Sequence, residues 1–355
     1  MRKNVLITHN CITHYRIPFF NKLADEYNVT VLHSGEKSTN KEYQFNEIFV
    51  PVKRIGRLYF QKGILQEVNK EKYDVIIASF DVAWIYTIIA LYKHNKKAKF
   101  ILWGSWITAN WLANQLRFFL AKRAFACIFY ANGIKNDFIN GGVPSTKLYV
   151  ANNTFDVGDR VQSYKYPIKR RILFVGSLDK RKQNDILIEV FSQILIKIPP
   201  NISLTIIGEG NEKHYLKEIS DKLKLNNNVE FLGKINDMNK SKEYYKEAIV
   251  SVSFGQAGLS VLQSFGYGVP YLTKKNAISG GEISNIKTEY NGILCEDNPI
   301  SLSEKLVFLC NNIDYARKLG KNAYDYYSKF CTIDNMVRGF KDAIENTKFA
   351  IIDEC

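Results

Sequence analysis

The feature that most constrains the fold of this chain is a regular alternation of short apolar runs with segments of helical periodicity. Runs this apolar are typical of strands buried on both faces, as in parallel sheets covered by helices. Alternating strands and helices predict βαβ units with right-handed crossovers, and therefore an α/β fold. The runs span residues 4–8, 29–33, 74–79, 99–104, 126–131 and 148–152 in the first half, and 171–176, 204–208, 229–233, 249–254, 269–273 and 292–296 in the second.

The chain divides at a polar segment, residues 157–170, which contains Gly and Pro and follows the first set of runs. A length of 355 residues also exceeds one ordinary core, so two domains are expected. We predict two Rossmann-like, doubly wound domains at residues 1–160 and 165–330. The helix in residues 331–355 is expected to pack back on the first domain. Ligands of such sheets bind beyond the carboxyl ends of the strands, so a cleft between two facing domains is the expected site.

Charge and cysteine usage limit the partners. The chain has 49 Lys and Arg against 35 Asp and Glu, a formal net charge of +14. This excess favours an anionic partner such as a nucleotide, a phospholipid surface or nucleic acid, although a lysine-rich proteome gives the same excess. No nucleic-acid-binding module is recognisable, so nucleic acid is not expected. The six scattered cysteines form no C-x-x-C pair, which argues against zinc and redox motifs and fits a reducing compartment.

The sequence predicts a cytoplasmic protein without a membrane span. It has no run of about 18 apolar residues, and residues 1–10 lack the apolar core of a signal peptide. Residues 106–125, WITANWLANQLRFFLAKRAF, are nevertheless aromatic and basic. Such a segment can lie on an anionic bilayer surface, which would make the protein peripheral on the inner face of the membrane. A buried interdomain helix explains the same composition.

Three loops of the second half carry the chemistry of a phosphate or nucleotide site. In GSLDKRKQNDILI, a strand is expected to end at Gly176 and a helix to follow, and Arg181 and Lys182 add charge for a pyrophosphate. In GEG, residues 208–210, two glycines let the backbone approach a ligand closely. In FGQAGLSVLQSFGYGVP, residues 254–270, free amides are expected at a helix start. An ordinary strand-to-helix turn explains any one of these loops, but the three in order are more specific.

With these loops, the second half resembles the family-4 retaining glycosyltransferases of GT-B fold. Those enzymes carry a pattern close to G-R-L-x-x-x-K-G-x-D-x-L-I, then G-x-G, E-G-F-G-L-S-x-L-E-A-x-A-x-G-x-P, a Gly-Gly turn and N-G-x-L. This sequence has GSLDKRKQNDILI, GEG, GQAGLSVLQSFGYGVP, SGGEI and NGILCED in the same order over most of residues 165–300. Over residues 1–150 the resemblance is limited to strand rhythm and the opening loop THNCITHYRIPFF, which is similar to loops of transferases that build bacterial surface polysaccharides.

The resemblance implies transfer of a hexosyl or deoxyhexosyl group from a nucleoside-diphosphate sugar to a saccharide or lipid-linked saccharide. The setting would be capsule, lipopolysaccharide O-antigen or exopolysaccharide synthesis. Lys182 would bind the donor pyrophosphate, and Glu282 would lie near the donor. The implied donor-binding residues are Gly176, Ser177, Lys182, Gly208, Glu209, Gly210, Gly255, Gly258, Leu259, Ser260, Gln263 and Glu282.

Three positions depart from the family pattern. Ser177 stands where the family has an arginine, so Arg181 would supply that charge. Gly255 replaces a glutamate that contacts the donor sugar hydroxyls, and Gln263 replaces the glutamate that holds the ribose. An amide still bonds ribose hydroxyls but without charge assistance, a difference of roughly 1 kcal/mol.

The chemistry implied by these loops needs no cofactor. No metal-binding pattern or pair of carboxylates accompanies them, and neither a metal nor another cofactor is expected. Fixed cations and amides can stabilise the departing diphosphate, so Lys182 and Arg181 are the catalytic candidates. In a retaining enzyme the acceptor attacks on the leaving-group face, and the departing phosphate takes its proton. Two alternatives remain open, a sugar-nucleotide epimerase of the same fold and a non-catalytic nucleotide-sugar-binding subunit.

The acceptor is expected in the first domain. His14 and Arg16 follow the first apolar run, at the carboxyl end where ligands bind. Arg16 is a candidate for holding an acceptor phosphate, although an ordinary surface arginine has the same sequence context. Gly104 and Ser105 follow the fourth run, where many relatives place a histidine, and would approach the donor sugar or the acceptor.

Overall fold

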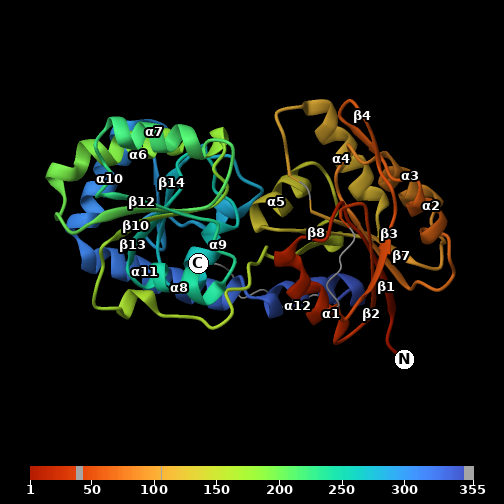
Figure 1. The fold of residues 1–355 in the computed structure, drawn as a ribbon. Coiled ribbons are helices and arrows are strands. Elements are labelled where there is room, and N and C mark those ends of the chain that lie inside the picture. The colour runs from red at the N-terminus through yellow and green to blue at the C-terminus, as the bar shows by residue number, and fades with distance from the viewer. Residues whose placement is uncertain (37–42, 105, 348–355) are drawn as a thin grey trace. The chain divides into compact units, whose positions relative to one another are not determined.

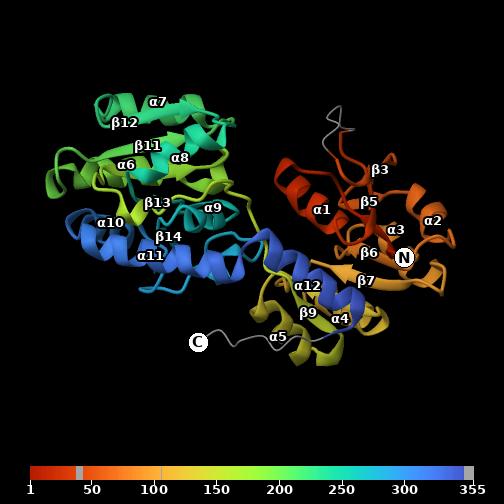
Figure 2. The ribbon, with the colours of Figure 1, turned by 90° about the horizontal axis from the view of Figure 1, so that it is seen from below.

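A computed structural model describes residues 1–36, 43–104 and 106–347. The chain forms two compact units, one comprising Met1–Asn153 and Ile333–Cys355 and the other Thr154–Thr332. Each unit is built on a parallel β-sheet with helices on both faces (Figures 1 and 2). The predicted α/β class with two Rossmann-like sheets is confirmed.

The first unit contains a seven-stranded parallel sheet in the order β3-β2-β1-β6-β7-β8-β9. Its strands are β1 (Asn4–Thr8), β2 (Asn28–His33), β3 (Asn46–Phe49), β6 (Val75–Ser79), β7 (Lys99–Trp103), β8 (Ala126–Phe129) and β9 (Leu148–Val150), with a separate antiparallel pair, β4 (Lys53–Ile55) and β5 (Leu58–Phe60). Its helices are α1 (Ile17–Ala24), α2 (Gly63–Val68), α3 (Ile85–Lys93), α4 (Trp111–Arg123), α5 (Asn132–Asn140) and α12 (Ile333–Glu345).

The alternation of side chains along each strand explains why helices cover both faces of this sheet. Val5 and Ile7 of β1 belong to the core formed with α1 and α12, whereas Leu6 between them packs in the core formed with α2 to α5. Because successive residues of a strand point to opposite faces, a run that is apolar at every position needs helices on both sides. Helix α12 comes from the far end of the chain and contributes Met336 and Phe340 to the first of these cores.

The second unit contains a six-stranded parallel sheet in the order β12-β11-β10-β13-β14-β15. Its strands are β10 (Arg171–Val175), β11 (Ser203–Ile207), β12 (Val229–Gly233), β13 (Ala248–Val252), β14 (Tyr271–Lys274) and β15 (Gly292–Cys295). Its helices are α6 (Asn184–Ile194), α7 (Lys213–Lys222), α8 (Met238–Lys246), α9 (Ser260–Gly266), α10 (Pro299–Asn311) and α11 (Ile313–Phe330). Helices α6, α7 and α10 share one core with the sheet, and α8 and α9 share the other.

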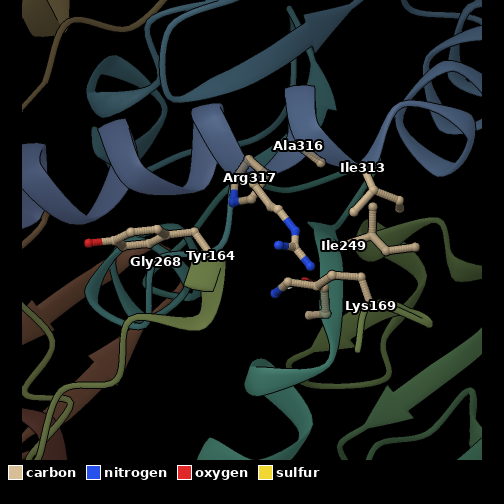
Figure 3. Close-up of a pocket in the computed structure, with 9 residues that line it drawn as sticks. Tyr164, Lys169, Ile249, Gly268, Ile313, Ala316 and Arg317 are labelled. Carbon is tan, nitrogen blue, oxygen red and sulfur yellow. Dashed lines mark hydrogen bonds between the residues drawn. The ribbon is translucent and has the colours of Figure 1, made fainter. Parts of the chain in front are cut away.

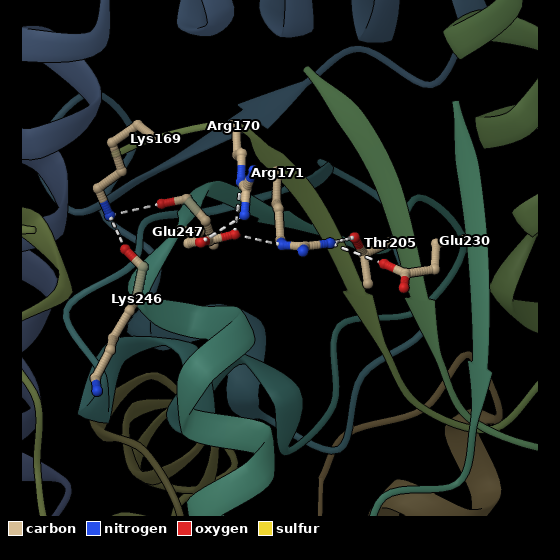
Figure 4. A network of polar contacts seen from close by, with 8 residues as sticks. Lys169, Arg170, Arg171, Thr205, Glu230, Lys246 and Glu247 are labelled. Carbon is tan, nitrogen blue, oxygen red and sulfur yellow. Dashed lines mark hydrogen bonds and ion pairs between the residues drawn. The ribbon is translucent and has the colours of Figure 1, made fainter. Parts of the chain in front are cut away.

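A polar network ties the amino ends of the second sheet together (Figure 4). Glu247, just before β13, accepts two hydrogen bonds from Arg170, at 2.8 and 2.9 Å, and a third from Arg171 at 2.8 Å. Arg171 also reaches Glu230 of β12 at 2.8 Å. The hydrogen bond from Arg170 is the largest influence that holds the pKa of Glu247 below its usual range. These amino ends are therefore fastened by side chains, which leaves the opposite edge for the loops.

We expect Phe340→Ala to destabilise the first unit by about 3–5 kcal/mol, because the ring is fully buried and its loss leaves a cavity. The Phe340 ring centroid lies 4.7 Å from that of Phe19 and 5.0 Å from that of Trp103. The four tryptophans all lie between residues 84 and 111, so denaturant unfolding followed by tryptophan fluorescence reports this unit. Phe119→Ala, at a half-exposed phenylalanine of α4, is the matched control and should lose less than about 1 kcal/mol. Equal losses in the two variants would contradict the packing role of α12.

Candidate functional site

The first loop of the second unit places a buried lysine at the carboxyl end of β10. A short 3₁₀ turn, Lys180–Lys182, leads into α6, and only 7% of Lys182 is exposed. A Cβ atom built on Gly176 would lie 3.7 Å from Lys182 Nζ, so the ammonium lies beside the end of the strand. Burial is the largest cause that lowers the pKa of Lys182, while Asp179 and Glu282 act in the opposite direction. A partly desolvated cation of this kind attracts an anion more strongly than an exposed one.

Gln183, at the junction between the turn and α6, has a backbone conformation that is unusual for a residue other than glycine. Its backbone is left-handed, with φ of 55° and ψ of 43°. This conformation is favoured by glycine, which is the residue at this position in the family pattern. The strained junction sets the direction in which α6 leaves the loop.

Three glycines from the other loops touch this first loop backbone to backbone. A Cβ atom would lie 1.8 Å from the carbonyl oxygen of Gly176 if placed on Gly208, and 2.2 Å from that of Leu178 if placed on Gly210. On Gly255 it would lie 2.2 Å from the carbonyl oxygen of Arg181. Such distances are impossible for real side chains, so each position needs glycine. The three sequence-predicted loops thus converge at one edge of the sheet.

Hydrogen bonds hold the converging loops in place. The amide of Gly255 donates to the carbonyl of Lys182 at 3.0 Å, and the amide of Leu178 donates to that of Glu209 at 2.9 Å. Two backbone hydrogen bonds join the segment before Glu282 to the Gly255 loop. The amide of Ala257 donates to the carbonyl of Ile278 at 2.9 Å, and the amide of Ile278 donates to the carbonyl of Gly255 at 3.0 Å. The Gly-Gly turn is therefore part of the same edge.

Glu282 brings a buried carboxylate to this edge. It begins the short turn Glu282–Asn285 with 7% of its surface exposed, and the amide of Gly280 donates to its Oε2 at 3.1 Å. Its charge raises the pKa of Lys182 against the larger effect of burial, so the two groups act on each other. The edge thus has an acidic side chain, although Gly255 and Gln263 stand where the family pattern has glutamates.

Other predicted donor residues are engaged locally. Arg181 is exposed and its Nε donates to Asp179 at 2.9 Å, while the Ser177 hydroxyl donates to the same carboxylate at 2.7 Å. Glu209 pairs with Lys213. The Ser260 hydroxyl lies 2.7 Å from that of Tyr271, whose pKa burial raises to about 12.

The remaining donor candidates lie at or near the start of α9. No atom would lie within 4 Å of a Cβ on Gly258, so this glycine is not required for packing. Leu259 is the N-cap residue of α9, and Gln263 lies within the helix and is 8% exposed.

Buried polar atoms without a hydrogen-bond partner gather beside Lys182 and Gly255. They are Gln183 Oε1, both side-chain polar atoms of Asn184, and Gln256 Oε1. A buried amide without partners is unfavourable, so these atoms indicate where a polar ligand or water completes the structure. Sequence reasoning missed Gln183, Asn184 and Gln256; their adjacency to Lys182 and Gly255 was the only available signal.

In the first unit, the structure gathers an aromatic and cationic cluster at the carboxyl ends of β1, β7 and β8. Arg16 is 4% exposed, and its Nη2 donates to the Tyr130 hydroxyl at 3.1 Å. Gly104 has a φ of 79° and faces the Tyr130 ring, whereas His14 is exposed. Ser105 lies outside the described residues.

Two members of this cluster were missed by sequence reasoning. His9 and Trp103 have ring centroids 5.2 Å apart, and Trp103 in turn lies against Arg16. Burial first, and then the charge of Arg16, lower the pKa of His9 to about 4.

A small depression lies at the amino ends of the second sheet, away from the converging loops. Tyr164, Lys169 and Arg317 line a small depression with Ala248, Ile249, Gly268, Pro270, Ile313 and Ala316, and Arg317 of α11 extends toward Lys169 (Figure 3). Lys169 Nζ donates to the carbonyls of Lys246 and Ala248, so this lysine fastens the amino ends of the sheet.

Among the described residues, no group of three His, Cys, Asp or Glu side chains is placed to hold a metal ion. Within the same ranges, no helix has the length and hydropathy to cross a membrane.

The chain is similar to known glycosyltransferases in sequence and fold. Residues 159–326 match the family of glycosyl transferases group 1. An uncharacterized glycosyltransferase of Haemophilus influenzae is 26% identical over 303 residues, which is 83% of this chain and 79% of that relative. HepE of Anabaena, solved with UDP, is similar with a TM-score of 0.74 at 17% identity, covering 97% of this chain and 99% of that one. The lipopolysaccharide outer core galactosyltransferase WaaB has a TM-score of 0.70 at 16% identity, covering 97% and 99%.

We expect Gly255→Ala to displace the Arg181–Gln183 backbone, because the new methyl group would overlap a carbonyl oxygen. Overpacking of this kind destabilises by about 1–3 kcal/mol. Differential scanning calorimetry should show a lower Tm for this variant, and titration with UDP, GDP and dTDP should show weaker binding of whichever nucleotide the wild type binds. Gly258→Ala is the matched control, since its methyl group meets open space. The convergence of loops at Gly255 would be refuted by equal melting and binding in the two variants.

Proposed function

We propose that this chain, a glycosyltransferase of the group 1, GT-B type, transfers a hexosyl or deoxyhexosyl group from a nucleoside-diphosphate sugar with retention of configuration. The acceptor is a saccharide or a lipid-linked saccharide of a bacterial surface polysaccharide. The observation that carries the proposal is the convergence of three glycine-containing loops on the buried Lys182. HepE is described in complex with UDP and glucose, and WaaB as a lipopolysaccharide galactosyltransferase, which supports this choice of donor and pathway.

In this proposal the donor diphosphate lies against Lys182. The ammonium sits beside Gly176, and the glycines at 208 and 210 let their loop pack against the backbone of the first loop at this point. Gln263 bonds the ribose through a neutral amide. The unpartnered amide of Asn184, next to this loop, supplies donors and acceptors for the same ligand.

Sugar transfer then depends on fixed charge. As the bond from the sugar to the diphosphate breaks, negative charge grows on the leaving oxygen, and a buried, preorganised cation stabilises it without reorganisation. Lys182 is the group in this position. Arg181, which is exposed and paired with Asp179, contributes less. The acceptor attacks on the face that the diphosphate leaves, so the departing phosphate accepts the proton. No step requires a metal or another cofactor.

We expect Lys182→Ala to lower the rate of nucleoside diphosphate release about 10²–10³-fold, the usual loss when one preorganised donor to a developing anion is removed. Release is measured with a panel of UDP, GDP, dTDP and CMP sugars and an acceptor extract. Lys180→Ala, at an exposed lysine of the same turn, is the control and should stay within about twofold of the wild type.

The competing functions give different results in this assay. A wild type that binds a nucleotide sugar but never releases the nucleotide is a binding subunit. Conversion of the donor without an acceptor indicates an epimerase. A product whose anomeric configuration by NMR is opposite to that of the donor contradicts retention.

We also propose that α4 rests on an anionic membrane surface. The helix buries Arg117 and exposes Trp111 and Leu112, which are 67% and 71% exposed. A helix that faces water normally buries its apolar side chains and exposes its charged ones, so α4 shows the opposite pattern. Leu116 and Phe119 are exposed on the same helix, and the basic side chains of its last turn, Lys122 and Arg123, favour anionic headgroups.

We expect the triple variant Trp111→Ser, Leu112→Ser and Phe119→Ser to lose most of its binding to vesicles of phosphatidylglycerol and phosphatidylcholine, because apolar insertion is removed. Flotation of the full chain in a density gradient measures the bound fraction. The control is Ile196→Ser with Ile300→Ser, which removes exposed apolar side chains of the second unit (92% and 72% exposed). Flotation that is equal for both variants, or equal on pure phosphatidylcholine, would overturn the assignment of α4.

A further inference from the structure

The guanidinium of Arg16 is buried in the first unit without an acidic partner. It forms no ion pair with any Asp or Glu of residues 1–36, 43–104 and 106–347. Its polar contacts are the Tyr130 hydroxyl and, at 3.4 Å, the Met336 thioether, which is a weak acceptor. The ring centroids of Tyr15, Trp103 and Tyr130 lie 5.3, 5.1 and 5.5 Å from its Cζ atom.

An unpaired cation in this position is unfavourable in the free protein. Aromatic faces compensate only part of the loss of hydration, and arginine cannot escape by releasing its proton. The neighbouring His9 adds no charge at neutral pH, because burial and Arg16 depress its pKa to about 4. Its Nδ1 lies 2.9 Å from the Cys11 carbonyl. The local charge is therefore positive and uncompensated among the described residues.

A second, independent observation points to a ligand. Three buried polar atoms of this cluster have no hydrogen-bond partner: Arg16 Nε, Trp103 Nε1 and Thr13 Oγ1. Arg16 and Trp103 are both more than nine-tenths buried. The guanidinium and indole nitrogens can only donate, and the hydroxyl can also donate. A group with several acceptor oxygens and negative charge can accept from all three.

These atoms come from elements that meet at one edge of the sheet. Trp103 ends β7, and Thr13 lies after β1, just before the short 3₁₀ turn His14–Arg16 that leads into α1. Carboxyl ends of parallel strands are where ligands of such sheets bind. The cluster also lies close beneath the surface, since His14 is exposed and Thr13 and Tyr15 are partly exposed.

We propose that Arg16, Trp103 and Thr13 form a phosphoryl-binding site in the first unit, and that it receives a phosphate group carried by the acceptor. A tetrahedral phosphoryl group presents three acceptor oxygens to a forked guanidinium and neutral donors, whereas a carboxylate presents two. Identification of this phosphate as part of the acceptor rests on the proposed glycosyltransferase function. The site itself rests only on the Arg16 cluster.

The test uses the full chain with inorganic phosphate as the probe, in a Lys182→Ala background that removes the proposed phosphate contact of the second unit. Isothermal titration calorimetry at constant ionic strength should give a Kd at least tenfold higher for Arg16→Gln. Trp103→Phe keeps an aromatic ring at this position but removes the indole N–H, and should raise the Kd several-fold. Arg54→Gln, at an exposed arginine over the Tyr59 ring, is the matched control and should leave the Kd unchanged. Acetate should bind more weakly than phosphate.

The outcomes separate this site from the proposed function. Tryptophan-monitored unfolding first establishes that the variants are folded. Phosphate affinity that does not change in folded Arg16→Gln and Trp103→Phe overturns the site, whether or not the wild type consumes a donor. Arg16-dependent phosphate binding in a protein that never releases nucleoside diphosphate supports the site and contradicts the transferase. If both hold, Arg16→Gln in the Lys182 wild type should raise KM for the acceptor while donor hydrolysis in water stays near its original rate; the opposite split contradicts an acceptor phosphate.

Discussion

Backbone contact at glycine is the constraint on which the second unit's site depends. Gly208, Gly210 and Gly255 each lie so close to a carbonyl of the first loop that any side chain would force the loops apart. This contact places the buried Lys182 beside Gly176 and joins the Glu282 turn to the same edge. The chemistry therefore depends on residues with no side chain, because they decide how closely the residues with side chains can assemble.

Most of the fold could be predicted because its strands are buried on both faces, and such strands are recognisable as continuous apolar runs. Each predicted run is a strand in the structure. The missed strands are β3 and the pair β4 and β5, where polar or exposed side chains break the pattern. An edge strand covered on one side has no continuous apolar run, so hydrophobicity alone does not distinguish it from a loop.

The loops that meet at the candidate site could be located from the sequence, but the contacts between their side chains could not. Local spacing of glycines and cations marked the loops, since strand-to-helix turns are encoded by neighbouring residues. The surroundings of Arg16 include Met336, which is 320 residues away in the sequence, and the unpartnered amide of Asn184 is recognisable only once the chain is folded. The ion pair between Arg181 and Asp179 could not be predicted either, although the two residues are close in the sequence. Spacing alone does not determine which oppositely charged group a side chain will contact.

The two buried cations, Lys182 and Arg16, differ in their charge environment, and the difference fits the different tasks that we propose for them. Lys182 has Asp179 and Glu282 near enough to raise its pKa against burial, so part of its charge is already balanced in the free protein. Among the described residues, the partners of the Arg16 side chain are a phenol, a thioether and aromatic rings, and none of them carries a negative charge. A cation whose charge is partly compensated by neighbouring carboxylates suits a site that must release its ligand after each turnover, because the ligand-free protein is then less unfavourable. A cation without such compensation suits a site that must hold one ligand while bonds change elsewhere. This difference in charge environment fits the roles that we propose, leaving-group chemistry at Lys182 and anchoring at Arg16.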